Sequence, residues 1–264
     1  MKLSNVIATG LLATATMAAC GSDTNSTVDA SKTIDAVIVD APPIVIDSPP
    51  AAACPVPPTV PAMITINGVG RQVTNFNIGT SSGVLVEAFR GASTTPEATT
   101  TTANDGKYTI TFTTNGVAVN GTIRGKKATF LDSYLYPGTA LYADVASAPV
   151  LMLKQSDIDL IASLAGASPL AKGTNFVGVA VTDCDGNSLA GATLTTTPTV
   201  KIRYNGSNSL PSSSATATSA DGIGFLFEVP AGNLVVTATV NGMSYPARTV
   251  KVIANTTAAT VLAP

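Results

Sequence analysis

Residues 181–191, V-T-D-C-D-G-N-S-L-A-G, constrain the fold more than any other stretch of the chain. Asp185, Gly186 and Asn187 are turn formers, because Gly and Asn accept positive φ and Asp bonds its own backbone. A valine-rich run precedes them, and residues 190–195 alternate after them with one apolar face. The stretch therefore predicts a strand, a tight turn and a second strand that open a module lasting to the C-terminus.

Similar signals return downstream. Asp221 and Gly222 form a second turn, and apolar residues then alternate over 223–229. Residues 230–233 turn the chain again, and residues 234–240 supply another strand. These pieces predict a β-sandwich over residues 168–264, with a core drawn from the inward-facing side chains Val179, Val181, Leu194, Phe225, Phe227 and Val236.

The order of these pieces resembles the carboxypeptidase regulatory-like domain, a transthyretin-like β-sandwich. The matching segments are D-C-D-G-N-S-L-A-G-A-T-L at 183–194, S-A-D-G-I-G-F-L-F-E-V-P-A-G at 219–232 and L-V-V-T-A-T at 234–239. The resemblance covers most of residues 173–264. It implies a non-catalytic accessory or surface-binding module, and the family has no universal catalytic residues to transfer.

A more divergent module of the same kind is predicted over residues 61–167. A-N-D-G-K-Y-T-I-T-F at 103–112 parallels S-A-D-G-I-G-F-L-F-E-V at 219–229, and a strand is expected next at 117–123. The spacing is about a domain length, which indicates a duplicated domain and not a solenoid. The opening of the second module, L-A-G-A, has no evident counterpart here.

A short helix is predicted between the modules, over residues 156–165. Ser156 and Asp159 form an S-x-x-D capping box, apolar residues recur at helical spacing, and Gly166 is a natural stop. The predicted fold class is all-β: two Ig-like, transthyretin-like β-sandwich domains joined by this helix.

Residues 1–19 have the pattern of a lipoprotein signal peptide. Lys2 precedes an apolar stretch, and M-A-A-C at 17–20 resembles a lipobox cleaved before Cys20. The alternative is an ordinary secretory peptide with an A-x-A-like cleavage site. Lipid on Cys20 would supply three acyl chains, which hold a protein far more firmly than a single chain, whose membrane binding is only marginal. Gly21 in place of Asp favours the outer membrane, on its periplasmic face or at the cell surface.

Residues 20–60 are predicted to be a disordered tether. They are rich first in Ser, Thr, Asp and Asn, and then in Pro, with A-P-P at 41–43 and C-P-V-P-P at 54–58. Proline favours extended conformations and hinders compact folding. The segment is therefore expected to lift the folded part off the membrane.

Composition excludes several classes of function. A net charge of −2 with only 11% charged residues argues against nucleic acid, which requires a basic surface. The chain has no His, which excludes His-dependent catalytic triads, His-ligated metals and imidazole acid–base catalysis. We predict no enzyme, no cofactor and no metal site. D-C-D-G-N at 183–187 resembles the start of a calcium loop, but no distal Glu follows.

Two cysteines remain once Cys20 is assigned to lipid. An oxidising envelope compartment favours pairing, and neither Cys54 nor Cys184 has metal-ligand spacing. We predict a Cys54–Cys184 disulfide, against the alternative of free or intermolecular thiols.

Residues 124–142 combine cations with aromatic rings. The candidate binding residues there are Lys126, Lys127, Tyr134, Tyr136 and Tyr142. Amphipathic rings beside a few cations suit a protein interface or a glycan. The alternative is a strand and loop whose rings cap one end of a sandwich.

These features predict a non-catalytic, lipid-anchored envelope protein. Its β-sandwich modules would serve binding or adhesion to protein or polysaccharide, with the membrane as a further partner through the lipid. The alternative is a structural spacer or assembly component of the outer membrane or cell surface.

Overall fold

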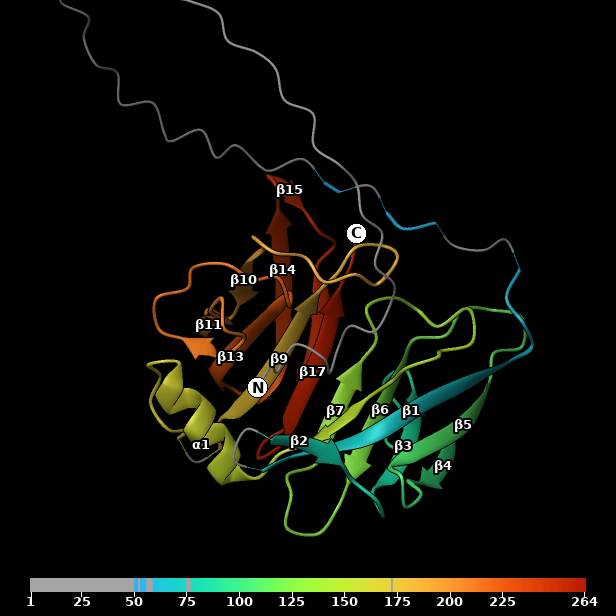
Figure 1. The fold of residues 1–264 in the computed structure, drawn as a ribbon. Coiled ribbons are helices and arrows are strands. Elements are labelled where there is room, and N and C mark those ends of the chain that lie inside the picture. The colour runs from blue at the N-terminus through green and yellow to red at the C-terminus, as the bar shows by residue number, and fades with distance from the viewer. Residues whose placement is uncertain (1–49, 52, 56–58, 75–76, 172) are drawn as a thin grey trace, which may run out of the picture. The chain divides into compact units, whose positions relative to one another are not determined.

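A computed structural model describes residues 50–51, 53–55, 59–74, 77–171 and 173–264, and all of them belong to one compact unit. These residues form strands and a single helix, so the predicted all-β fold class is confirmed (Figure 1). No helix of the described residues is long and apolar enough to cross a membrane. The predicted signal peptide and Cys20 lie outside the described residues.

The first half, residues 61–167, is built mainly of strands. They are β1 (Met63–Thr74), β2 (Asn77–Thr80), β3 (Leu85–Arg90), β4 (Ala98–Thr101), β5 (Lys107–Thr113), β6 (Gly121–Lys126), β7 (Ser133–Tyr136) and β8 (Val150–Met152). The helix α1 (Gln155–Leu164) follows. The strand predicted at 117–123 is wrong in position: Val117 lies in a turn with 66% of its surface exposed, and β6 begins at Gly121.

The second half, residues 168–264, forms its strands close to the predicted positions. They are β9 (Asn175–Val181), β10 (Thr193–Thr197), β11 (Lys201–Asn205), β12 (Pro211–Ser212), β13 (Ile223–Val229), β14 (Gly232–Val240), β15 (Met243–Ser244), β16 (Arg248–Val252) and β17 (Thr257–Leu262). From Leu234 onward, every second residue of β14 is buried in the core. This alternation of buried residues is the reason the sequence predicted a strand here.

A nine-stranded sheet contains strands of both halves, in the order β12-β11-β13-β9-β17-β7-β6-β3-β4. It is continuous because β17 pairs in parallel with β9 on one side and with β7 on the other. A four-stranded sheet of β2, β1, β5 and β8 belongs to the first half, and another of β10, β14, β15 and β16 to the second. Each half has its own apolar core between two sheets.

The two faces of β13 serve different cores. Leu226 faces the sandwich, whereas Phe225 and Phe227 face α1. Both pack against Phe176, Phe225 stacked at a ring-centroid distance of 5.8 Å and Phe227 tilted at 5.4 Å. The prediction that Phe225 and Phe227 fill the sandwich core is therefore wrong. Both faces of β13 are buried, so alternation alone does not assign the side. A bulge at Glu228, where φ is 57°, then returns Val229 to the sandwich.

The helix begins one residue earlier than predicted and uses a different cap. The Asp157 carboxylate accepts a hydrogen bond from the Lys154 backbone N–H at 2.9 Å. Asp159 instead accepts from the Gln155 side chain at 2.9 Å. The capping role predicted for Ser156 and Asp159 is therefore wrong, because Asp157 is the acidic residue three positions after the true N-cap.

The first half contains a hydrogen-bond knot centred on Thr102. Its Oγ1 accepts from the Val84 N–H at 2.9 Å and donates to the Ser81 carbonyl at 2.8 Å. Its backbone carbonyl accepts from Gly83, and its N–H donates to Val84. Gly106, four residues later with φ of 79°, leads into β5.

The second half repeats this knot at Thr218. Its Oγ1 accepts from the Ala192 N–H at 2.9 Å and donates to the Leu189 carbonyl at 2.7 Å. Its backbone carbonyl accepts from Gly191, and its N–H donates to Ala192. Gly222, four residues later with φ of 69°, leads into β13. The bonds follow the same order in both halves, so S-S-G-V at 81–84 is the counterpart of L-A-G-A at 189–192. The view that this segment has no counterpart is corrected.

Strand pairing repeats as well. The first strand of each half pairs antiparallel with the strand after the Asp-Gly turn and parallel with the last strand: β1 with β5 and β8, β9 with β13 and β17. The predicted internal repeat is thus confirmed by topology and by hydrogen bonds. The exact domain limits stay a prediction.

Candidate functional site

Two of the predicted binding tyrosines lie in the joint between the halves. Tyr134 and Tyr136 stand on β7, beside β17, with their rings stacked at 6.5 Å. Tyr134 is 8% exposed and belongs to the core of the second half. The Tyr136 hydroxyl donates to the Lys251 carbonyl at 2.5 Å. Little of either ring is left for a ligand in this arrangement.

A charged pair lies beside this joint, within the first half. Arg124 donates to the Glu87 carboxylate at 2.7 Å, and its guanidinium lies over the rings of Phe89 at 5.0 Å and Tyr134 at 5.9 Å. The hydrogen bond with Glu87 is the main cause that raises the pKa of Arg124 above its usual value. The pair is largely buried, and its contacts link β3, β6 and β7 across the sheet.

The predicted lysines lie elsewhere. Lys126 and Tyr142 are half-buried. Lys127 donates to the Ser81 hydroxyl at 2.9 Å and stands over the Phe130 ring at 5.6 Å, where Lys154 joins it at 5.3 Å. The five candidate residues are thus divided between separate surroundings, and their binding role stays a prediction.

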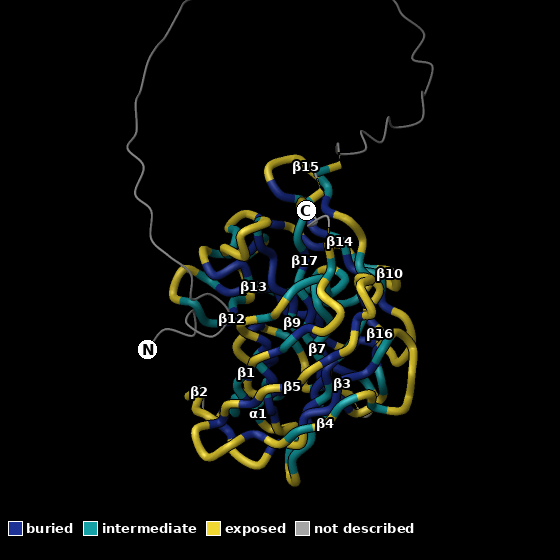
Figure 2. Tube along the Cα trace, turned by 90° about the vertical axis from the view of Figure 1, so that its right-hand side faces the viewer, coloured by how far each residue is buried: buried dark blue, intermediate teal, exposed yellow. Residues whose placement is uncertain are grey.

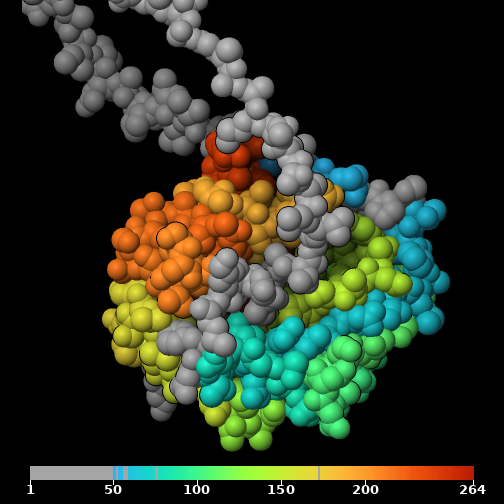
Figure 3. Space-filling view, in the orientation of Figure 1, coloured from blue at the N-terminus to red at the C-terminus, as the bar shows by residue number. Residues whose placement is uncertain are grey.

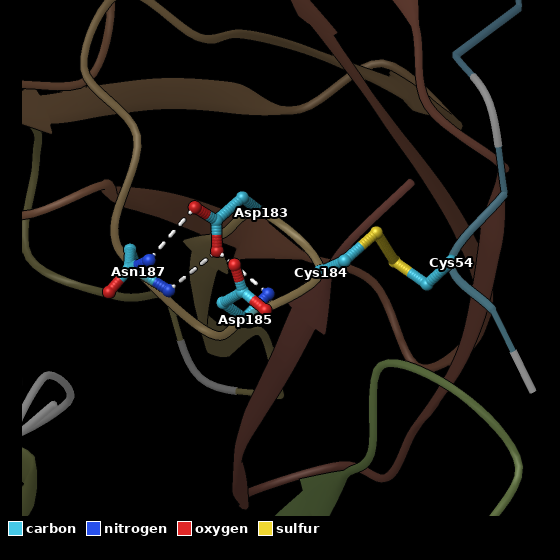
Figure 4. The surroundings of a disulfide bond; sticks show 5 residues. All are labelled: Cys54, Asp183, Cys184, Asp185 and Asn187. Atoms are coloured by element: carbon cyan, nitrogen blue, oxygen red, sulfur yellow. Dashed lines mark hydrogen bonds between the residues drawn. A yellow bond between two sulfur atoms is a disulfide. The ribbon is translucent and has the colours of Figure 1, made fainter. Parts of the chain in front are cut away.

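A disulfide joins Cys54 to Cys184, with the two Cα atoms 5.3 Å apart, as Figure 4 shows. The predicted pairing is confirmed. The two residues are 130 positions apart. The closed loop therefore contains the whole first half and α1.

Asp183 shapes the turn that carries Cys184. Its Oδ1 accepts from the backbone N–H groups of Asp185 at 3.0 Å and Asn187 at 2.8 Å, and its Oδ2 accepts from the Asn187 amide at 3.0 Å (Figure 4). Burial raises the pKa of Asp183, but the bonds from Asn187, Asp185 and Gly186 outweigh it and lower the pKa below its usual value. Among the described residues, no group of three or more Asp, Glu, Cys or His side chains is placed to hold a metal.

The segment around Cys54 is bound to the second half at further points. The Ala51 N–H donates to the Ser244 carbonyl at 2.8 Å, and the Cys54 N–H donates to the Pro264 carbonyl at 3.2 Å. Ala51 also packs against the core of the second half. Figure 2 shows β15 and the C-terminus at the same end of the fold. We call the described residues of this segment, 50–51 and 53–54, the strap.

No family model and no curated protein matches the chain. Among solved structures, the shaft pilin SpaA from Lactobacillus rhamnosus GG is 13% identical, with a TM-score of 0.27 over 76% of this chain and 98% of that one. The minor pilin GBS52 from Streptococcus agalactiae is 13% identical, with a TM-score of 0.24 over 76% and 95%. The Bacillus anthracis TIE protein is 10% identical, with a TM-score of 0.25 over 75% and 33%.

Proposed function

We propose that this chain is a non-catalytic protein of the bacterial cell envelope, anchored in the outer membrane through lipid on Cys20. Its β-sandwich body presents a surface for binding or adhesion to protein or polysaccharide. The observation that carries the proposal is the strap, because it fastens the N-terminal side of the chain covalently to the second half.

The bond changes where a pull on the N-terminus enters the fold. Without it, force would pass from residue 59 into β1 and through the first half. With it, force enters at Cys184, and the 130-residue loop is closed to extension. A disulfide that shields half of the body from tension suits a protein held to a membrane by its N-terminus while its body holds something else.

A spacer role is the second candidate, and the joint between the halves favours it. The parallel β7–β17 pairing and the hydrogen bond from the Tyr136 hydroxyl to the Lys251 carbonyl fix one half to the other. Two sandwiches fixed in this way would hold the structures bound at their two ends at a constant distance. A spacer requires this property.

Lipidation and fractionation test the anchor. The full chain is produced in a Gram-negative host with an alkyne-labelled fatty acid, beside Cys20→Ser and the matched control Cys54→Ser. We expect label and outer-membrane location for the wild type and for Cys54→Ser, and neither for Cys20→Ser. Label on Cys20→Ser, or an unlabelled soluble wild type, would refute the anchor.

Binding and spacing are separated by a pull-down. The full chain carrying Cys20→Ser is immobilised and exposed to envelope polysaccharide and to envelope proteins. Retention of a specific component supports binding, whereas retention of none leaves the spacer role as the function of the body.

A further inference from the structure

The strand that precedes the threonine knot belongs to different sheets in the two halves. In the first half, β4 pairs with β3. In the second half, β11 lies in the same connection and pairs with β13 instead. The strands β5 and β13 are counterparts, because each follows an Asp-Gly turn and pairs antiparallel with the first strand of its half. Among the described strands, β5 therefore has a neighbour only on its β1 side.

Hydrogen bonds of β1 show which backbone groups of β5 face away from it. Thr109 and Thr111 lie opposite Asn67 and Thr65 of β1. The Asn67 N–H donates to the Val145 carbonyl at 2.8 Å, and the Val145 N–H donates to the Thr65 carbonyl at 2.9 Å. These two residues of β1 thus bond away from β5. Opposed residues of an antiparallel pair exchange either both bonds or none, so the N–H and C=O groups of Thr109 and Thr111 point to the outer side of β5.

The outer side of β5 is occupied at both ends. At its start, the Lys107 N–H donates to the Asp105 carboxylate at 3.0 Å, and the Lys107 carbonyl accepts from the Ala103 N–H at 2.9 Å. At its end, the Thr113 carbonyl accepts from the Arg90 guanidinium. Between these ends, the outward donors and acceptors of the two threonines have no partner in the described part of the chain.

The middle of β5 lacks the usual protection of an edge strand. Natural edge strands are protected by charged side chains, by proline, by a bulge or by a covering segment. Residues 108–112, Y-T-I-T-F, contain neither charge nor proline, and their pairing with β1 has no shift of register. Thr109 and Thr111 are exposed, and Figure 3 shows the strand, in green, at the surface of the first half. This edge is therefore open to another strand.

The uncovered edge of the second half is closed in a different way. Because β11 pairs with β13, β10 has no strand on its outer side among the described residues. The outward Leu194 N–H of β10 donates to the Tyr204 hydroxyl at 2.8 Å, and Pro198 follows the strand. A side chain thus takes the place of a strand on β10, whereas none of the described side chains does so at Thr109 or Thr111 of β5.

We propose that β5 is an interface between two copies of this chain, which pair antiparallel through this edge. In a two-fold register centred on Ile110, Thr109 of one copy lies opposite Thr111 of the second copy. Each unpaired N–H of these threonines then meets an unpaired carbonyl, and none of the groups is left over. The sheet of one copy continues into the other, as β7 and β17 continue one sheet through the two halves of a single chain.

Length, side chains and charge favour a second copy over an unrelated strand. The occupied ends at Lys107 and Thr113 limit pairing to a strand as short as β5 itself. The register sets threonine opposite threonine, a favourable cross-strand pair. Each end carries an ion pair, Lys107–Asp105 at 3.1 Å and Arg90–Glu97 at 2.7 Å, so the ends that meet are neutral. With a net charge of −2, two copies repel each other only weakly.

Analytical ultracentrifugation of the full chain carrying Cys20→Ser measures the association. The edge is much smaller than a standard interface of about 1,600 Å², so we expect a dissociation constant on the order of 0.1 mM. The dimer fraction should rise with protein concentration up to about 1 mM. A protein that stays monomeric over this range overturns the proposal, and this outcome includes the case in which β5 pairs with a different protein.

Charge variants test whether β5 forms the interface. Thr109→Lys/Thr111→Lys sets lysine opposite lysine and should weaken the dimer by about tenfold or more. Thr109→Glu/Thr111→Lys sets glutamate opposite lysine and should dimerise at least as tightly as the wild type. The matched control is Thr193→Lys/Thr195→Lys, which changes two exposed threonines of the same spacing on β10 and should leave the dimer unchanged. A dimer that withstands the lysine pair, or that the glutamate–lysine pair does not restore, overturns the proposal.

Cysteine variants test the register. Directly opposed Cα atoms of a hydrogen-bonded pair lie about 5.5 Å apart, within the range of roughly 4.4–6.8 Å that a disulfide spans. Diagonal neighbours lie about 7–8 Å apart. After addition of oxidised glutathione, Thr109→Cys mixed with Thr111→Cys should therefore form a disulfide between copies, and neither variant alone should do so. Cross-linking of a single variant as fast as the mixture overturns the pairing. None of these results depends on lipid at Cys20, so failure here is distinguishable from failure of the proposed anchor.

Discussion

Removal of the Cys54–Cys184 disulfide should lower the stability of the folded body substantially. The bond closes a loop of 130 residues. In the chain-entropy model, a loop of this length restricts the unfolded chain enough to contribute about 5 kcal/mol at 25 °C. For a body of this size, about 1 kcal/mol corresponds to about 2–4 °C in Tm, so the double variant Cys54→Ser/Cys184→Ser should melt about 10–20 °C lower.

Differential scanning calorimetry of the full chain measures this difference. The double variant is made in the Cys20→Ser background, and Cys20→Ser alone is the matched control, so both proteins lack the proposed lipid and differ only at the two bonded cysteines. The core of the second half includes Val179, Leu194 and Val236 and contains neither cysteine. The double variant should therefore still fold. A fall in Tm of less than about 3 °C would refute the account of the bond as a constraint on the unfolded chain.

Three further predictions follow from single residues. Thr218→Val removes the hydroxyl that bridges Ala192 and Leu189 and should cost about 1–3 kcal/mol in urea denaturation; a loss below about 0.5 kcal/mol would contradict the role of the knot. Glu228→Gly relieves a positive φ of 57° and should stabilise the fold by up to about 1 kcal/mol, so a destabilised variant would count against strain at this bulge. Asp183 has a lowered pKa, so its contribution to stability is present above its unfolded pKa and is lost as pH falls through the folded pKa; an NMR titration should give a midpoint below 3.8, and one above 3.8 would contradict the turn geometry.

Local chemistry explains what the sequence predicted well. Strands such as β9 and β14 alternate or are valine-rich. The Asp-Gly turns after β9 and before β13 require positive φ, which Gly186 and Gly222 adopt. The disulfide was predictable because only two cysteines remained for an oxidising compartment. These signals need no knowledge of distant partners.

Non-local arrangement explains what the sequence did not predict. The parallel pairing of β17 with β7 joins Thr257–Leu262 to a strand of the other half, and no periodicity specifies a partner so distant. The same pairing places Tyr134 and Tyr136 in the joint between the halves, although rings beside cations had suggested a binding surface. Asn205 lies in no sequence motif, yet its side-chain amide donates to the Asp221 carboxylate. The equivalent aspartate of the first half, Asp105, pairs with Lys107 instead.

Single-molecule stretching of the full chain between its two ends tests the strap most directly. The 130 residues between the bonded cysteines stay closed while the disulfide is intact, and at about 3.3–3.6 Å per residue they add about 430–470 Å once it is reduced. We therefore expect reductant to lengthen the fully unfolded chain by this amount. The same unfolded length with and without reductant would contradict it.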